Sequence, residues 1–241
     1  MKKFIVGNWK MQKLFSEIHP YFKVFKHKIN SNHIEVGLAV PSLYIKPCLE
    51  EMINTPFILG AQDVSMHDLG AFTGEVAASQ LCSMPVTFSL VGHSERRQHF
   101  HETSDAVIKK AHKLQQQGLL SIVCIGETLE QKKDFKKVLA AQLEGVFSLN
   151  PALLMIAYEP VWAIGTGQTA SIEDIKTAHQ YIKSFLKEGS RDFYAVKVLY
   201  GGSVNETNAA SILALDDVGG LLIGGACLDP VKFEKLIAQL G

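Results

Sequence analysis

Eight short apolar segments recur along this chain of 241 residues, and their repetition constrains the fold more than any other feature. Each segment is rich in Val, Ile, Leu or Phe and lacks polar alternation, as strands do when both of their faces are buried. The segments are 4–7, 36–40, 57–60, 88–92, 120–125, 153–157, 196–200 and 220–223. We therefore expect a sheet that is covered on both faces.

Between the apolar segments lie stretches with apolar residues at three- and four-residue spacing, which predicts helices. The clearest are 11–29, 103–117, 129–147, 172–187 and 230–240, and shorter ones are 42–53, 75–82 and 206–213. Strands that alternate with helices form parallel sheets with right-handed crossovers, and eight such units in about 250 residues is the size of a closed (β/α)8 barrel. The sequence thus predicts one α/β domain over residues 1–241, with eight parallel strands ringed by helices. The alternative is a doubly wound open sheet, which would seldom use eight units so evenly.

Charge and cysteine content exclude several classes of partner. Lys and Arg together number 24, as do Asp and Glu, so nothing attracts nucleic acid or an anionic membrane. No apolar run is long enough to span a membrane, and the N-terminus enters a strand without a signal-peptide core. The far-spaced Cys48, Cys82, Cys124 and Cys227 favour free thiols in a reducing compartment. We expect a cytoplasmic protein.

Polar residues and glycines follow the predicted strands, at the end where a barrel of this kind carries its active site. They are Asn8 and Lys10 after the first strand, His93 after the fourth, Glu159 after the sixth, Gly201 and Gly202 after the seventh, and Gly224 and Gly225 after the eighth.

The two glycine pairs predict a phosphate site. They expose backbone N–H groups next to helix N-termini, and the loops after strands seven and eight are the usual phosphate site of this fold. Lys10 adds a cation at the mouth of the barrel. The alternatives are tight turns without a ligand for the glycines and a solvated surface charge for Lys10. Two pairs at these two strands favour the phosphate site.

Glu159 is followed by a segment with the composition of a lid. The segment consists of Pro160, Val161, Trp162, Ala163, Ile164, Gly165, Thr166, Gly167 and Gln168. Such a loop can swing on stiffened ends and exclude water, and a carboxylate beneath it becomes a stronger base when it is desolvated. A plain surface loop is the alternative, although it would expose three large apolar side chains together. Gly165, Gly167 and Ala170 formally match a dinucleotide-binding fingerprint, which requires its first glycine directly after the strand. Five residues separate Glu159 from Gly165, so we do not expect a dinucleotide site.

His93 opens a predicted helix, and the positive end of the helix dipole disfavours an imidazolium there. We therefore expect a neutral ring that donates a hydrogen bond, while a ring that only caps its helix is the alternative. Ser94 lacks the glycine that would complete a hydrolase nucleophile elbow. His99 and His101 have no surrounding carboxylate ligands, so we predict no metal site.

One carboxylate base, one neutral donor, one cation and a phosphate cradle under a lid suit proton abstraction next to a carbonyl, with an enediolate to stabilise. No cofactor motif accompanies them, so we expect a reaction without cofactor. A lid has a reason to exist here, because a phosphorylated enediolate readily loses its phosphate.

Seven motifs resemble the triosephosphate isomerase family, and the similarity runs from Lys3 to the last helix. They are GNWKM at 7–11, GAFTGE at 70–75, GHSERR at 92–97, VCIGE at 123–127, AYEPVWAIGTG at 157–167, YGGSV at 200–204 and GGA at 224–226. The resemblance implies a TIM barrel, a homodimer, and an isomerase of glycolysis and gluconeogenesis. Its substrates would be dihydroxyacetone phosphate and D-glyceraldehyde 3-phosphate.

The resemblance also implies roles for individual residues. Glu159 would move the proton and His93 would polarise the carbonyl, which is the known pairing of this family. The substrate would be held by Lys10, Asn8, Gly165, Ser203, Gly224 and Gly225, and Ile164 and Leu222 would close over Glu159. Glu95 would be a partner of Lys10. The loop around Thr73 would enter a pocket beside the active site of the partner subunit.

Two departures from the family pattern bear on these expectations. Gln12 and Lys13 stand where the family usually has Asn-Gly, near the expected subunit interface, and Gln168 replaces a usual lysine at the lid hinge. Two other functions stay open on the sequence alone. A different phosphate-binding barrel enzyme would need another acid–base pair. A silent barrel kept for binding would have lost Lys10, His93 or Glu159, and none is lost.

Overall fold

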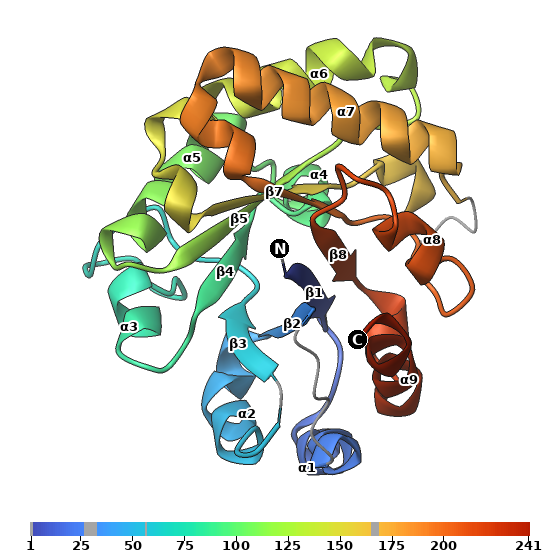
Figure 1. Cartoon of the computed structure of the whole chain (residues 1–241). Helices are drawn as coiled ribbons and strands as arrows, with labels where there is room; N and C mark the ends of the chain where they lie inside the picture. The colour runs from blue at the N-terminus through green and yellow to red at the C-terminus, as the bar shows by residue number, and fades with distance from the viewer. Residues whose placement is uncertain (1, 27–32, 56, 165–168) are drawn as a thin grey trace.

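A computed structural model of the chain describes residues 2–26, 33–55, 57–164 and 169–241. Eight parallel strands form a closed barrel in sequence order, which confirms the predicted fold class. They are β1 (Lys3–Asn8), β2 (Ile34–Val40), β3 (Phe57–Ala61), β4 (Phe88–Val91), β5 (Leu120–Ile125), β6 (Leu154–Tyr158), β7 (Lys197–Tyr200) and β8 (Gly220–Ile223). In Figure 1 the strands occupy the centre of the molecule and the helices surround them.

The helices lie between the strands, as predicted. They are α1 (Ile18–Lys23), α2 (Ile45–Glu51), α3 (Ala78–Cys82), α4 (Ser94–His99), α5 (Ser104–Gln116), α6 (Phe135–Leu143), α7 (Ile172–Gly189), α8 (Ala209–Leu213) and α9 (Pro230–Leu240). Short 3-10 helices adjoin them: η1 (Phe15–Glu17), η2 (Val24–Lys26), η3 (Ser42–Tyr44), η4 (Lys132–Asp134), η5 (Glu144–Ser148), η6 (Pro151–Leu153), η7 (Val161–Ala163), η8 (Arg191–Ala195) and η9 (Gly225–Cys227).

The first helical prediction was wrong at its start. Helical structure begins at Phe15, not at residue 11, because Lys13 has a positive φ of 75° that no α-helix accepts. The end of that prediction falls in residues 27–32, outside the described residues. A capping box starts α7, since the Ser171 hydroxyl accepts the N–H of Asp174 at 3.0 Å.

Side chains alternate between two cores, one inside the barrel and one between the strands and the helices. The inner cluster consists of Phe4, Val6, Ala39, Phe88, Leu90, Ile122, Cys124, Ala157, Leu199 and Leu222. The Phe88 ring packs directly over Gly60 of the neighbouring strand β3, where a Cβ would lie only 2.3 Å from the ring. The barrel is therefore a filled core, and only its strand ends can carry a site.

The four cysteines are free, as their spacing predicted. Cys48, Cys124 and Cys227 are buried, whereas Cys82 is exposed. Burial raises the pKa of the Cys48 thiol and of the Cys227 thiol to about 12, so both stay protonated at neutral pH. Cys48 and Cys227 therefore lack the exposed thiolate of a reactive cysteine.

His179 on α7 makes stability depend on pH. It is fully buried, and burial lowers its pKa from 6.5 to about 4. Between these pH values the unfolded state binds more protons than the folded state. The neutral ring therefore contributes stability that is complete above about pH 6.5 and is lost as the pH falls to about 4, about 3 kcal/mol in all.

We expect His179→Gln to lose this part of the acid sensitivity. Urea unfolding of the variant and of the wild type, at pH 7 and at pH 4.5 and at equal protein concentration, checks it. The difference in unfolding free energy between the wild type and the variant should be smaller by a few kcal/mol at pH 4.5 than at pH 7. His112→Gln, which changes a partly exposed histidine on α5, serves as the control and should follow the wild type. If the unfolding free energies of His179→Gln and the wild type fall equally between pH 7 and pH 4.5, His179 is not the source of this pH dependence.

Candidate active site

A cavity of about 340 Å³ lies at the carboxyl ends of the strands. It brings together the predicted site residues Asn8, Lys10, His93, Glu159, Ile164, Ser203, Leu222, Gly224 and Gly225. They come from β1, β4, β6, β7 and β8 and the turns that follow these strands. Gly165, Thr166, Gly167 and Gln168, which the lid prediction also included, lie outside the described residues.

Glu159 is a buried carboxylate at the end of β6, with 1% of its surface exposed. Its Oε2 accepts the backbone N–H of Ser94 at 2.7 Å, and its Oε1 lies 3.1 Å from Nε2 of His93. That second contact is short but poorly aligned, because Oε1 accepts no hydrogen bond of good geometry from the described residues. One oxygen therefore anchors the side chain, and the other is left to take a proton.

Two glycines make room for this carboxylate. A Cβ on Gly126 would lie 1.7 Å from the Glu159 carbonyl oxygen, and a Cβ on Gly201 would lie 2.9 Å from its Cγ. The first contact involves the backbone, which cannot yield as a flexible side chain can. Glycine at these strand ends therefore serves the close approach of Glu159, in addition to any role in a turn.

His93 caps α4, the helix that follows β4. Its Nδ1 accepts the backbone N–H of Glu95 at 3.3 Å, which assigns the ring proton to Nε2. The Nε2–H group faces the cavity beside Glu159. His93 thus both caps its helix and presents a donor, and the two predicted alternatives are compatible.

Lys10 lies across the cavity mouth, with its ammonium 2.6 Å from Oε1 of Glu95. Burial works against the charged form of Glu95, but the hydrogen bond from Lys10 and the attraction of Lys10, His93 and His99 together outweigh it and lower the pKa of Glu95. The pair is only partly buried, with 25% and 43% of the two side chains exposed. Glu95 therefore holds the cation of Lys10 in place, as the family resemblance implied.

The glycines after β7 and β8 form the other wall of the cavity. A Cβ on Gly224 would lie 3.0 Å from Cε of Lys10, so a side chain there would displace the lysine. A Cβ on Gly225 would meet nothing within 4 Å, and Gly225 begins η9. Backbone N–H groups at the start of this helical turn, next to an ammonium, suit a bound anion.

The described part of the lid is tied to the barrel on both sides. The Ser203 hydroxyl donates to the Ala163 carbonyl at 2.7 Å, and Nε1 of Trp162 donates to Oε1 of Glu127 at 2.8 Å. A plain surface loop would have exposed Trp162, but only 8% of it is exposed. The indole can be buried because its N–H finds a carboxylate.

Sequence reasoning missed Glu127, which follows β5 and lies beneath the lid. It is 1% exposed, and burial raises its pKa. Its Oε1 also accepts the Tyr158 hydroxyl at 3.0 Å. Lys132 lies over the Trp162 ring, 3.6 Å from its centre. The available signal was a carboxylate two residues after a buried strand, which resembles the signal at Glu159, directly after β6.

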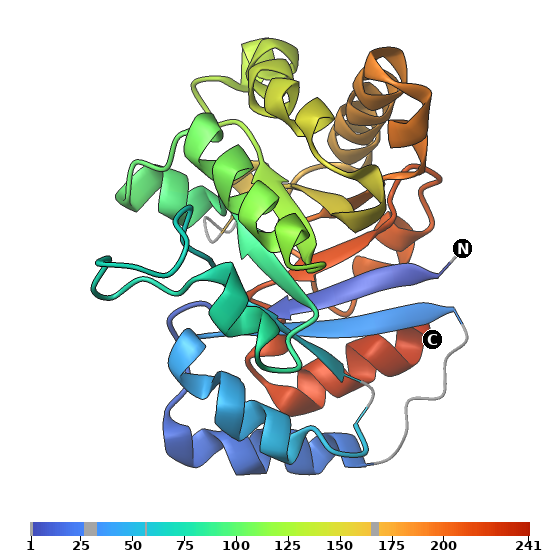
Figure 2. The same ribbon diagram turned by 90° about the vertical axis from the view of Figure 1, so that its left-hand side faces the viewer.

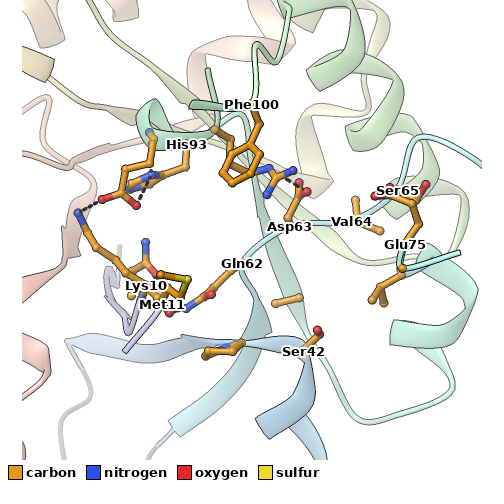
Figure 3. A pocket seen from close by; sticks show the side chains of 17 residues that line it. Lys10, Met11, Ser42, Gln62, Asp63, Val64, Ser65, Glu75, His93 and Phe100 are labelled. Carbon is orange, nitrogen blue, oxygen red and sulfur yellow. Dashed lines mark hydrogen bonds and ion pairs between the residues drawn. The ribbon is translucent and has the colours of Figure 1, made fainter. Parts of the chain in front are cut away.

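A second cavity, of about 380 Å³, adjoins the first and shares Asn8, Lys10 and His93 with it. Figure 3 shows this cavity, with Asp63 and Glu75 on the side away from Lys10 and His93, and with Gln62 between. Its floor contains charges that the sequence did not reveal as a group. Nε of Arg96 lies 2.9 Å from Asp63 in an ion pair, and Lys110 donates to Asp63 at 2.8 Å. Asp63 is thus held by two cations, of which Lys110 is nearly buried.

Thr73 lies in neither cavity of its own chain. It is exposed on the segment 65–76, which projects from the barrel between β3 and α3 (Figure 2). The ends of this segment are joined, since the N–H of Ser65 donates to the carbonyl of Val76 at 2.8 Å. Inside it, the rings of His67 and Phe72 stack with their centres 4.0 Å apart. The segment thus has a defined shape.

The described residues were expected to hold neither a metal site nor a membrane-spanning helix. No group of three or more His, Cys, Asp or Glu side chains is arranged to hold a metal ion there. Nor does any helix of the described residues have the length and apolar character needed to cross a membrane.

Comparison with known proteins identifies the family. The family model for triosephosphate isomerase matches residues 3–240. The triosephosphate isomerase of Thermodesulfovibrio yellowstonii is 44% identical over 243 residues, which cover 98% of each chain. Those of Thermus thermophilus and Albidiferax ferrireducens are 41% and 40% identical, over 98% and 99% of this chain and 98% of each relative. The chain belongs to the triosephosphate isomerase family.

Proposed function

We propose that this protein interconverts dihydroxyacetone phosphate and D-glyceraldehyde 3-phosphate by proton transfer, without a cofactor, in glycolysis and gluconeogenesis. The observation that carries the proposal is the pairing of Glu159 with His93. A buried carboxylate oxygen without a well-aligned donor lies 3.1 Å from a histidine nitrogen at the edge of a cavity. This arrangement suits removal of a proton from carbon next to a carbonyl.

In the proposed reaction, Oε1 of Glu159 takes a proton from C1 of the ketose. The C2 carbonyl oxygen gains negative charge as the enediolate forms, and the Nε2–H of His93 and the ammonium of Lys10 stabilise it. His93 gives its Nε2 proton to O2 and takes up the proton of the O1 hydroxyl, and Glu159 returns its proton to C2, which yields the aldose. The anchor from Ser94 keeps the carboxylate aimed throughout, because it holds the oxygen that does not react.

The phosphate group would lie against the backbone N–H groups of Gly224, Gly225 and Ser203, and of Gly165 in the lid, with Asn8 and Lys10 beside the substrate. Ile164 and Leu222 would cover Glu159 and keep it dry, since both line the cavity. Exclusion of water strengthens the base and delays loss of phosphate from the enediolate. The lid residues Gly165 to Gln168 would complete this cover.

We also propose that two copies of the chain form a homodimer in the cytoplasm. The segment 65–76 would enter the partner's second cavity, with Thr73 at its tip. Exposed apolar side chains near this cavity and on this segment support it, with Met11 95%, Phe100 66% and Phe72 43% exposed. Three buried free thiols fit a reducing compartment.

We expect Glu159→Gln to lower kcat by at least ~10²–10⁴, because glutamine keeps the shape of the side chain and can still accept from Ser94 but cannot take a proton. A coupled assay with glyceraldehyde 3-phosphate measures the rate. Competitive inhibition by inorganic phosphate should change little, because backbone groups hold the phosphate. Glu173→Gln, which changes an exposed glutamate on α7, is the matched control. Near-normal turnover in Glu159→Gln would contradict proton transfer by Glu159.

We expect the wild-type protein to sediment as a dimer at micromolar concentration and Thr73→Arg to shift it toward monomer. A long charged side chain at the tip of the segment cannot enter a fitted cavity without desolvation. Val231→Arg is the control, because Val231 is a 48% exposed side chain on α9, away from the segment 65–76 in Figure 1. A wild-type protein that is active and purely monomeric under these conditions would refute the dimer.

A further inference from the structure

The backbone of Lys10 adopts a conformation that needs support from its surroundings. Its φ is 53°, in the left-handed region that residues other than glycine seldom adopt. Such a residue persists only when neighbouring groups hold it, and it commonly marks a functional site. Lys10 and Glu95 both line the second cavity, and their side chains form a 2.6 Å ion pair. The direction of the Lys10 ammonium therefore depends on this turn.

Two hydrogen bonds hold the Lys10 backbone. Its N–H donates to Oδ1 of Asn8 at 2.9 Å, which is a local contact two residues away. Its carbonyl oxygen accepts from Nε2 of Gln62 at 2.8 Å, which is a contact between distant parts of the chain. Only the second links the turn to another strand, and Gln62 directly follows β3. The orientation of the lysine is therefore set partly from outside its own loop.

Gln62 uses both hydrogens of its amide in this region. Besides Lys10, Nε2 donates to the Ala39 carbonyl at 3.3 Å, and the same carbonyl accepts the N–H of Trp9 at 3.0 Å. One amide thus connects the ends of β2 and β3 with the turn after β1. Figure 3 shows Gln62 extending toward Lys10 and Met11. A side chain without N–H groups could not make either contact.

Gln62 lines the second cavity but not the catalytic one. It therefore does not reach the space proposed for substrate, and any effect on the reaction must pass through another residue. Asp63, its neighbour, is fixed by the ion pairs to Arg96 and Lys110. Because the next residue is held in place, the Gln62 backbone is restrained, and its amide can restrain the lysine turn.

We propose that Gln62 is a positioning residue for Lys10. Its amide holds the left-handed turn that directs the ammonium to Glu95 and the catalytic cavity. The inference rests on the proposed isomerase function for its kinetic test but not for its structural test. It assigns a role in the reaction to a residue that no sequence motif pointed out.

The kinetic test is a double-mutant cycle. Gln62→Leu should lower kcat/KM roughly tenfold to a hundredfold, as expected when a reacting group is displaced by about 1 Å. In a Lys10→Met background the same change should have no further effect, because the side chain that it orients is gone. Gln115→Leu is the matched control. Gln115 is also partly buried and also donates to backbone carbonyls, at 3.0 Å to Leu153 and 3.2 Å to Asn150, near the opposite ends of the strands.

The outcomes separate a positioning role from a structural one. A loss for Gln62→Leu that vanishes with Lys10→Met supports the inference, whereas equal losses in both backgrounds, or none beyond the control, overturn it. If Gln62→Leu does not fold by circular dichroism, Gln62→Glu replaces it, because glutamate keeps the size and loses both N–H groups. A wild-type protein without isomerase activity would instead contradict the proposed function.

A crystal structure of the Gln62 variant tests the inference independently of turnover. We expect Lys10 to leave the left-handed conformation and its ammonium to move away from Oε1 of Glu95. An unchanged Lys10 turn would overturn the inference, whatever the activity of the wild type.

Discussion

Closure of the barrel between β1 and β8 is the constraint on which the rest of the molecule depends. The two strands pair in parallel, with Phe4 opposite Gly220, and a Cβ on Gly220 would lie only 1.9 Å from the Phe4 carbonyl oxygen. A residue with a side chain could not take this place without moving one strand. Closure brings the turn with Asn8 and Lys10 against the glycines after β8, so that a cation from the start of the chain and backbone donors from its end share one cavity.

The carboxylates around this cavity show how burial is put to different uses. Glu127 is buried with two donors on one oxygen, and it holds the base of the lid to the barrel. Glu95 is half exposed and bound to Lys10, which lowers its pKa and keeps it charged. Glu159 is as buried as Glu127 but has a single well-formed hydrogen bond. Each of these two carboxylates leaves its other oxygen without a hydrogen bond among the described residues, which costs free energy, and at Glu159 that oxygen lies 3.1 Å from Nε2 of His93.

Two residues other than glycine adopt the left-handed backbone conformation in the segment after β1. Lys10 and Lys13 both have positive φ, 53° and 75°. At position 13 the family usually has glycine, which adopts this conformation without strain, so the chain keeps the turn despite the departure. The Lys13 carbonyl accepts the Tyr44 hydroxyl at 3.1 Å, and its ammonium lies 3.3 Å from Glu17. The surrounding structure thus holds a turn that local preference alone would not form.

The sequence by itself determined the order of the elements, the parallel barrel and the strand ends from which the site is built. Apolar runs and glycine pairs are local signals, and they placed Glu159, His93 and Lys10 at the correct ends of β6, β4 and β1. What it could not determine were contacts between side chains from distant strands. The burial of Trp162 on Glu127, the left-handed turns at Lys10 and Lys13, the ion pairs of Asp63 and the reach of Gln62 all depend on strand register and barrel closure. These arise only when the whole chain has packed, because each joins groups that no local pattern brings within hydrogen-bond distance.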